Sequence, residues 1–337
     1  DAERIDDAVF QSAEAHTRDM NAILDTFVER TTVRDASFEL PTSGELQPGS
    51  ENGTPRPTQG YQTISQGYPM FRGMDSFGLN REAYAKLTVR EMDKLMAGVQ
   101  SKDARWIMRR VFGAIFTNVS WTFKEPGRSD LTVRGLAVTG DGSIYLDFNG
   151  DLTTADHYTG QADAISNSAN PYEANSAILR THPANTGVIV SYIPPGLMAT
   201  TAALEGFYPY QPNDGLVDFG GLVDVAAANV GAFQRFGNEV MGVVGDNVIV
   251  VSRRLPAGYV VSVVDTDEAP LVMREEPEAE LQGLQAVPMV VDSNFRKFDF
   301  YRKAGFAVRN PIAIAVREIS DATYDIPSGY DLRTLQG

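Results

Sequence analysis

The sequence predicts an α+β protein whose domains are discontinuous along the chain. A helix-capping pattern at Thr88 precedes a long run with apolar residues at helical spacing, which predicts one helix over 89–116. Short alternating or apolar segments typical of strands follow it. An apolar strand returns late, at 312–316, after a mixed block of helices and strands. Late strands that rejoin earlier elements are typical of α+β architecture.

The first thirty residues predict an amphipathic helix. Its apolar positions recur at steps of three and four: Ile5, Val9, Ala13, His16, Met20, Ile23, Leu24 and Phe27. Residues 31–62 are rich in Pro, Gly, Ser and Thr, and such a segment cannot build a core of its own. We therefore expect an extended arm or linker here, and a helix that buries its apolar face elsewhere.

Residues 61–87 carry aromatic and apolar side chains punctuated by glycines 67, 73 and 78. We expect 61–71 to form one strand of a hairpin-like excursion. Exposed aromatic surface of this kind usually contacts another chain. Five residues of the arm and excursion are therefore our candidates for subunit contacts: Ile5, Val9, Ile64, Tyr68 and Phe71.

The helix expected over 89–116 begins with the capping-box pattern Thr88-Val-Arg-Glu91. Gly98 and Ser101 are expected to weaken its middle. The predicted apolar face is formed by Val89, Met92, Leu95, Met96, Val99, Ile107, Val111 and Ile115, and the basic residues, Arg110 among them, are expected mostly around the other face.

Later elements follow from period and turn chemistry. Residues 131–138 and 143–148 are expected to pair as a hairpin across Gly140-Asp-Gly142. Helices are expected over 171–180, 197–207 and 222–233, and strands over 187–193, 247–252, 259–264, 270–274 and 298–302.

Bulk composition excludes several function classes. The chain has 29 basic and 44 acidic residues, for a net charge of −15, and a surface of that sign repels phosphate, so sequence-specific nucleic-acid binding is not expected. The 337 residues hold no cysteine, which excludes disulfides and thiolate chemistry within them. No apolar run suits a membrane span, and no secretory leader is expected. The start at Asp1 instead of methionine leads us to hypothesise proteolytic trimming.

No motif points to catalysis or to a bound group. Nucleotide-binding loops, hydrolase elbows and zinc-helix patterns are missing from the sequence, so we predict no enzyme, no catalytic residue, no cofactor and no metal. His16, His157 and His182 share no metal spacing and are expected in loops or on the surface. The acidic clusters at 147–151 and 265–268 are expected to be solvated turns. A carboxylate pair drawn from distant positions stays open.

The C-terminal third carries the clearest family resemblance. Val248-Ile-Val-Val-Ser252 followed by Arg254-Leu-Pro-Ala-Gly-Tyr-Val-Val261 gives strand, Pro-Gly turn, strand. Phe300-Tyr-Arg-Lys-Ala-Gly-Phe-Ala-Val-Arg-Asn-Pro-Ile-Ala-Ile314 leads through a Gly-Phe-x-Val-x-x-Pro pattern into an apolar strand. With the order of parts, this resembles the Hong Kong 97-type fold of tailed-phage major capsid proteins.

The resemblance implies a division of the chain: an N-terminal arm with its helix (1–60), an extended loop (61–87), a peripheral domain with a spine helix (88–149 plus 291–320), an axial domain (150–290) and a C-terminal tail (321–337). It also implies hexamers and pentamers of an icosahedral shell around double-stranded DNA. The expected location is the virion, after assembly in the host cytoplasm. Expected partners are other copies, a portal, and scaffolding or decoration proteins, with DNA contacted non-specifically and no membrane.

Some members of that family join neighbours covalently through a lysine of the extended loop. Here the first lysine is Lys86, at the base of that loop, so a shell without isopeptide links is expected. Two other functions stay open: an encapsulin-type compartment with the same fold, and a monomeric α+β hydrolase with residues 208–221 lining its cleft. Particle size separates a shell from a monomer, and the contents separate a phage from an encapsulin.

Overall fold

A computed structural model of the chain describes residues 2–24, 28–39, 63–86, 88–139, 145–147, 152–153, 155–210, 238–266, 268–292 and 295–336. Its helices are α1 (Ala2–Leu24), α2 (Arg81–Lys86), α3 (Val89–Phe116), α4 (Pro171–Arg180) and α5 (Met198–Ala202). Short 3₁₀ turns are η1 (Pro195–Leu197), η2 (Ala279–Leu281) and η3 (Leu332–Gln336).

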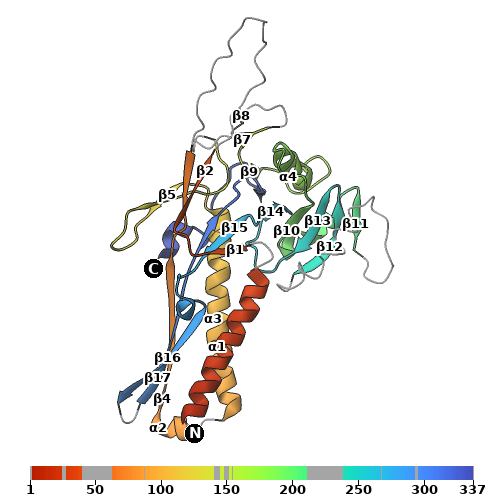
Figure 1. Cartoon of the computed structure of the whole chain (residues 1–337). Coiled ribbons are helices and arrows are strands. Elements are labelled where there is room, and N and C mark those ends of the chain that lie inside the picture. Colours follow the sequence, from red (N-terminus) through yellow and green to blue (C-terminus); the bar gives the residue numbers. More distant parts are fainter. Residues whose placement is uncertain are drawn as a thin grey trace, which may run out of the picture.

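The two long helices run side by side along the lower half of the molecule (Figure 1). Helix α3 begins where the sequence predicts because Thr88 caps it. The backbone N–H of Glu91 donates to the Thr88 hydroxyl at 3.3 Å, and the backbone N–H of Thr88 donates to the Glu91 carboxylate at 3.0 Å. Both predicted helices are confirmed, and α3 continues unbroken through Gly98.

A five-stranded sheet lies against the long helices. Its path is β1 (Val28–Thr31), β15 (Leu271–Arg274), β17 (Phe295–Val308) and β16 (Leu284–Asp292), and β4 (Phe71–Asn80) pairs with the free edge of β17. The fourteen-residue β17 pairs with β16 and β4 over its first part and with β15 over its last. The first part forms a three-stranded extension, β4-β17-β16, beside α1 and α3 (Figure 1).

A seven-stranded sheet forms the other body of the molecule. In order its strands are β11 (Phe207–Pro209), β12 (Glu239–Val244), β13 (Asn247–Val251), β10 (Ile189–Ile193), β14 (Tyr259–Val264), β18 (Ile314–Ile319) and β9 (Tyr158–Gln161). Three small hairpins complete the fold: β2 (Asp35–Glu39) with β3 (Thr63–Gly67), β5 (Trp121–Phe123) with β6 (Leu131–Val133), and β7 (Tyr145–Leu146) with β8 (Leu152–Thr153).

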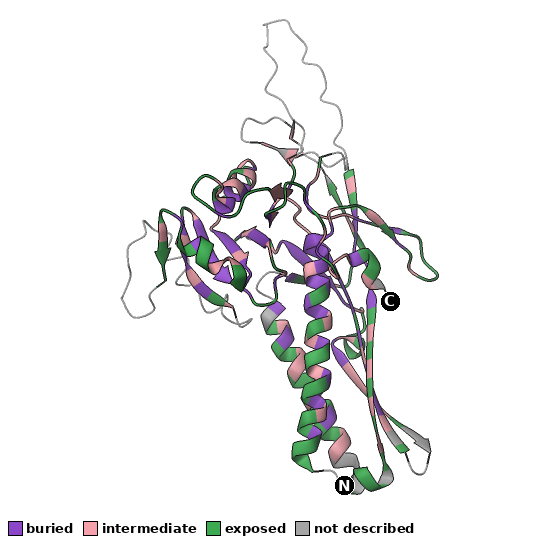
Figure 2. Cartoon of the chain, turned by 180° about the vertical axis from the view of Figure 1, so that it is seen from behind, coloured by how far each residue is buried: buried purple, intermediate pink, exposed green. Residues whose placement is uncertain are grey.

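The main core lies where the C-terminal half of α3 meets both sheets. Ile107, Val111 and Phe116 of α3 have no exposed surface there, and Met273 of β15 and Ile314 of β18 pack in the same cluster. Figure 2 shows how burial changes along α3: its lower end has both buried and exposed residues, and its upper end is mostly buried. Burying both sheets on one helix makes α3 the part that fixes their relative position.

Several predicted elements have different partners or bounds. The strand expected over 61–71 is divided, since β3 ends at Gly67 and β4 begins at Phe71. In the described residues the expected pairing of 131–138 with 143–148 is not seen, because β6 pairs back with β5 and β7 pairs with β8; the turn Gly140-Asp-Gly142 lies outside those residues. Only 198–202 of the helix expected over 197–207 is α-helical. The helix expected over 222–233 lies outside the described residues.

Each of the two sheets draws strands from more than one of the predicted segments, and the division into peripheral and axial domains stays a prediction. Strand β18, expected in the peripheral domain, lies between β14 and β9 in the seven-stranded sheet. Strand β15, expected in the axial domain, lies in the five-stranded sheet. The segment 61–87 is no free excursion either, since β4 pairs with β17 over ten residues. The pairing partners of a strand depend on distant sequence, so local patterns did not reveal them.

Candidate subunit-contact surfaces

Three of the five predicted contact residues lie inside their own subunit. Val9 is fully buried, Tyr68 is 4% exposed and Phe71 is 2% exposed. Ile5 and Ile64 are half-buried. The need for burial that led us to predict Val9, Tyr68 and Phe71 is therefore met by the chain itself, and contact with a neighbour stays a prediction for Ile5 and Ile64.

Helix α1 finds its apolar partner on the same chain. Val9 packs with Met96 of α3 and with Phe298 and Phe300 of β17. The backbone N–H of Leu284 in β16 also donates to the hydroxyl of Thr17, at 3.0 Å. The arm therefore covers the inner face of the three-stranded extension, and the expectation that neighbours must complete this helix is wrong for its buried face.

A buried ionic cluster ties α1 to α3 and β17. Asp103 receives hydrogen bonds from Arg302 at 2.6 and 2.8 Å and from the Nε2 of His16 at 2.9 Å. Burial by itself would raise the pKa of Asp103, but the hydrogen bonds from His16 and the charge and hydrogen bonds of Arg302 hold it below its usual value. The cluster stabilises one arrangement of these three elements.

The outer face of the three-stranded extension exposes three large apolar side chains among charged ones, which include Lys297, Asp299 and Lys303 of β17. In register, Met74 of β4 lies beside Tyr301 of β17, and Val287 and Met289 of β16 continue the same face. Met74 is 70% exposed, Val287 42% and Met289 45%. We call these three side chains the outer apolar face. An exposed face of this kind is typical of a protein contact.

Sequence analysis missed the outer apolar face. The signal was present, because 284–289 has apolar residues at both even and odd positions. In a strand with one face exposed to solvent, apolar and polar residues alternate. Apolar residues at both even and odd positions indicate instead that both faces are covered. Even positions face α1 and α3, and Val287 and Met289 point the other way.

The β2–β3 hairpin is clamped at its base by Glu125. Arg34 donates to this carboxylate at 2.8 Å and Arg274 of β15 donates at 3.0 Å. Burial would raise the pKa of Glu125, but the hydrogen bonds from Arg34 and Arg274 and the charges of Arg274 and Arg128 lower it. Phe38 of β2 is 36% exposed beyond this clamp. The hairpin is thus a second candidate contact element, joined by residues 40–62, which lie outside the described part.

Two expectations about the faces of α3 are wrong. Arg110 is 7% exposed, because its guanidinium lies 3.9 Å from the ring centre of Trp106 and donates to the Leu335 carbonyl at 2.8 Å. Burial lowers the pKa of Arg110 to about 10. Val89, placed on the apolar face, is 80% exposed at the first turn of α3.

His157 and His182 lie in loops, as expected, but both are buried, and His16 lies on helix α1. His157 and His182 are fully buried and stacked, with their Nε2 atoms 3.1 Å apart, and the Nδ1 of His157 lies 2.7 Å from the Ile314 carbonyl. That carbonyl can only accept, so Nδ1 of His157 carries the proton and its Nε2 accepts from His182. Burial lowers the pKa of His157 to about 4. Partners distant in sequence create this pair, and no spacing could have revealed it.

Within the described ranges, no cluster of three or more His, Asp or Glu residues could hold a metal ion. Of the two acidic clusters, residues 148–151 and Asp267 are outside those ranges. No described helix is long and apolar enough to cross a membrane.

The comparisons with known proteins rest on structure alone. No family model matches the chain, and no curated protein matches it. Its structure is similar to one from Mycobacterium phage Patience, with a TM-score of 0.74 and 18% identity over 96% of this chain and 90% of that one. It also resembles a chain of the mature capsid of bacteriophage PhiM1 (TM-score 0.51, 11% identity, 88% and 86% covered) and one of the capsid of a native GTA particle (TM-score 0.52, 12% identity, 89% and 91% covered).

The fold is therefore that of phage capsid proteins. The α+β architecture of the Hong Kong 97 type, expected from the order of helices and strands, is confirmed at the level of the fold.

Proposed function

We propose that this chain is the major capsid protein of a tailed bacteriophage. It assembles into hexamers and pentamers of an icosahedral shell that encloses double-stranded DNA. The observation that carries the proposal is the shared fold along 96% of the chain with a phage structure, together with the likeness to two capsid chains. The same likeness supports a structural role, and we propose that the chain has no catalytic activity.

The surfaces of the subunit support this role. The three-stranded extension has one face covered by α1 and α3 and the outer apolar face uncovered. A shell gains its stability from many modest contacts that are repeated in every subunit. We infer that the outer apolar face, Ile5, Ile64 and the β2–β3 hairpin contact neighbouring subunits. The hairpin, and not residues 61–87, then takes the place of the extended loop.

The partners follow from the role. They are other copies of the chain, a portal, and scaffolding or decoration proteins, with packaged DNA contacted non-specifically. The location is the virion, after assembly in the host bacterial cytoplasm. A net charge of −15 suits a wall that must not hold DNA tightly.

Sedimentation velocity and electron microscopy of the purified chain test the proposal. We expect capsomers or closed shells in the megadalton range. A species of 36.7 kDa that persists at every concentration contradicts the shell and favours a monomeric protein. Particles isolated from the native source are expected to hold double-stranded DNA, whereas particles filled with a protein cargo would contradict the phage assignment and support an encapsulin.

A further inference from the structure

A basic groove of about 660 Å³ lies where α3 meets two loops of the C-terminal half. Four arginines line it: Arg105 and Arg109 from α3, and Arg253 and Arg254 from the turn after β13. All four are exposed. Four cations on one groove stand out in a chain with a net charge of −15.

The arginines of the groove have no acidic partners in the described part of the chain. None of the four forms an ion pair there, and Arg109 donates to the backbone carbonyl of Gly329, at 2.6 Å. Four like charges gathered in a concave site favour a ligand of negative charge, since the potential of a cleft is focused by its walls.

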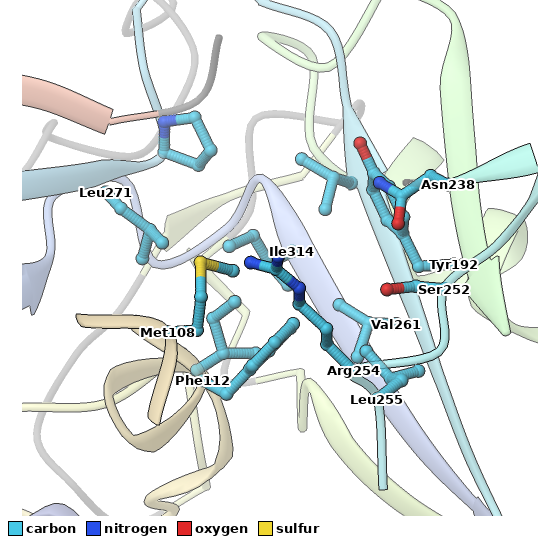
Figure 3. A pocket seen from close by; sticks show the side chains of 13 residues that line it. Met108, Phe112, Tyr192, Asn238, Ser252, Arg254, Leu255, Val261, Leu271 and Ile314 are labelled. Carbon is cyan, nitrogen blue, oxygen red and sulfur yellow. The ribbon is translucent and has the colours of Figure 1, made fainter. Parts of the chain in front are cut away.

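The floor of the groove is apolar. Met108, Phe112 and Tyr330 line it, and Met108, Phe112 and Arg254 also line the apolar cavity next to it. Figure 3 shows Arg254 lying between Met108 and Phe112 on one side and Val261 on the other. The groove therefore offers an apolar surface bordered by cations, which fits a short peptide segment with both acidic and apolar side chains.

The same chain carries such a segment. In residues 276–281, Glu278 and Glu280 are exposed and Leu281 is 51% exposed. Two hydrogen bonds to backbone carbonyls hold the turn in shape. The backbone N–H of Leu281 donates to the Glu278 carbonyl at 2.9 Å, and the side chain of Gln282 donates to the Glu276 carbonyl at 2.7 Å. Lys303 of β17 pairs with Glu276 and fixes the base of the turn.

We propose that the acidic turn 277–281 of one subunit docks in the basic groove of a neighbouring copy. Glu278 and Glu280 pair with Arg253 and Arg254, and Leu281 packs on the apolar floor. The contact is heterologous, because two different surfaces meet, and heterologous contacts can close into rings. It rests on the proposed function, since it assigns a contact between subunits of the shell.

A second copy fits this groove better than DNA does. A DNA duplex is convex, and its phosphates bind polar side chains on an open surface. They would make no favourable contact with the apolar floor of the groove. Two copies that each carry a charge of −15 also repel each other, unless basic side chains of one copy lie opposite acidic side chains of the other. The pre-shaped turn costs little ordering entropy on docking.

Charge reversal tests the contact. We expect Arg253→Glu with Arg254→Glu, and separately Glu278→Arg with Glu280→Arg, to lower the particle yield roughly tenfold or more through like-charge contact. Combining all four changes is expected to restore the yield. The matched control Arg90→Glu with Lys94→Glu makes the same charge change at exposed sites outside the groove and should assemble normally. Unchanged melting curves of the subunits separate lost assembly from lost folding.

Cysteine pairing provides a direct readout, because the chain has no cysteine of its own. Glu280→Cys combined with Ser328→Cys, at the rim of the groove, is expected to give covalent multimers when assembled particles are oxidised. Glu173→Cys with Ser328→Cys, where Glu173 lies on α4, should stay monomeric.

Full assembly of both charge-reversal variants without cross-linking overturns the docking and leaves the shell function intact. Normal assembly of the arginine variant with reduced DNA content points to phosphate binding and also overturns it. A wild-type chain that forms no particles at all contradicts the proposed function itself.

Discussion

Arg302 of β17 and Asp103 of α3 form a two-pronged ion pair with almost no access to water. The two hydrogen bonds measure 2.6 and 2.8 Å, and the side chains are 2% and 5% exposed. A pair buried this deeply is costly to break, because either partner left alone is an uncompensated charge.

Asp103→Asn tests how much this ion pair contributes to the stability of the subunit. We expect the free energy of unfolding of the unassembled subunit to fall by about 3–5 kcal/mol, because Arg302 would remain charged and buried. Urea denaturation measures it. Asp75→Asn is the matched control, since Asp75 pairs with Lys102, which is 62% exposed, and we expect a loss of at most about 1 kcal/mol. Equal losses in the two variants would refute the prediction.

Acid is expected to destabilise the subunit through His157. Its pKa is about 4 in the folded chain and about 6.5 when unfolded, so the unfolded chain binds the extra proton first as the pH falls. Stability is therefore complete above about pH 6.5 and declines by up to about 3 kcal/mol on the way to pH 4. Asp103 does not contribute in this window, because its pKa lies below its usual value of 3.8.

Unfolding curves at pH 7 and pH 4.5 measure this decline. His157→Gln is expected to flatten it. A decline that survives in His157→Gln would mean that other groups titrate.

Gly98→Ala should stabilise α3. An added Cβ at this exposed position meets nothing within 4 Å, and alanine is favoured over glycine inside a helix by about 0.5–1 kcal/mol. A raised melting temperature measures the gain. Gly113→Ala in the same helix is the control, because its Cβ would lie 3.3 Å from the Tyr330 carbonyl and from Leu332. A larger gain at Gly113 would contradict this account.

The outer apolar face should matter for assembly and not for folding. Met74→Asp with Met289→Asp is expected to leave subunit melting nearly unchanged, since both side chains are already exposed, and to lower the particle yield. Light scattering during assembly measures the yield. Val9→Asp, at a fully buried position, should unfold the subunit instead. Normal assembly of the double variant would remove this face from the contact surfaces.

Assembled particles should dissociate fully in denaturing gels. The first lysine, Lys86, lies in α2 and not in the β2–β3 hairpin, so the hairpin offers no amine for a covalent link. One band at 36.7 kDa is expected, and a ladder of multimers would show covalent links between subunits.

Local signals predicted the fold well where the cause was local. The capping box at Thr88 and the apolar period gave α3 its bounds, and the helix expected over 171–180 is α4. Strands β13, β14 and β15 followed from short apolar runs.

The partners of strands and charges were not predictable in this way. Strand β4 pairs with β17, more than two hundred positions later, and His157 donates to Ile314. Arg110 was placed in solvent because a charge usually lies there, and stacking on Trp106 reversed that expectation. The burial of Val9 within its own chain was missed for the same reason, since Val9 meets side chains of β17 that no local pattern connects to it.

The position of β18 limits when a subunit can take shape. This strand comes more than 150 positions after β9, yet it lies between β14 and β9 in the seven-stranded sheet. A ribosome must therefore deliver every residue up to Ile319 before that sheet can close. Truncated products would keep open strand edges, and only finished molecules would be competent to join a growing particle.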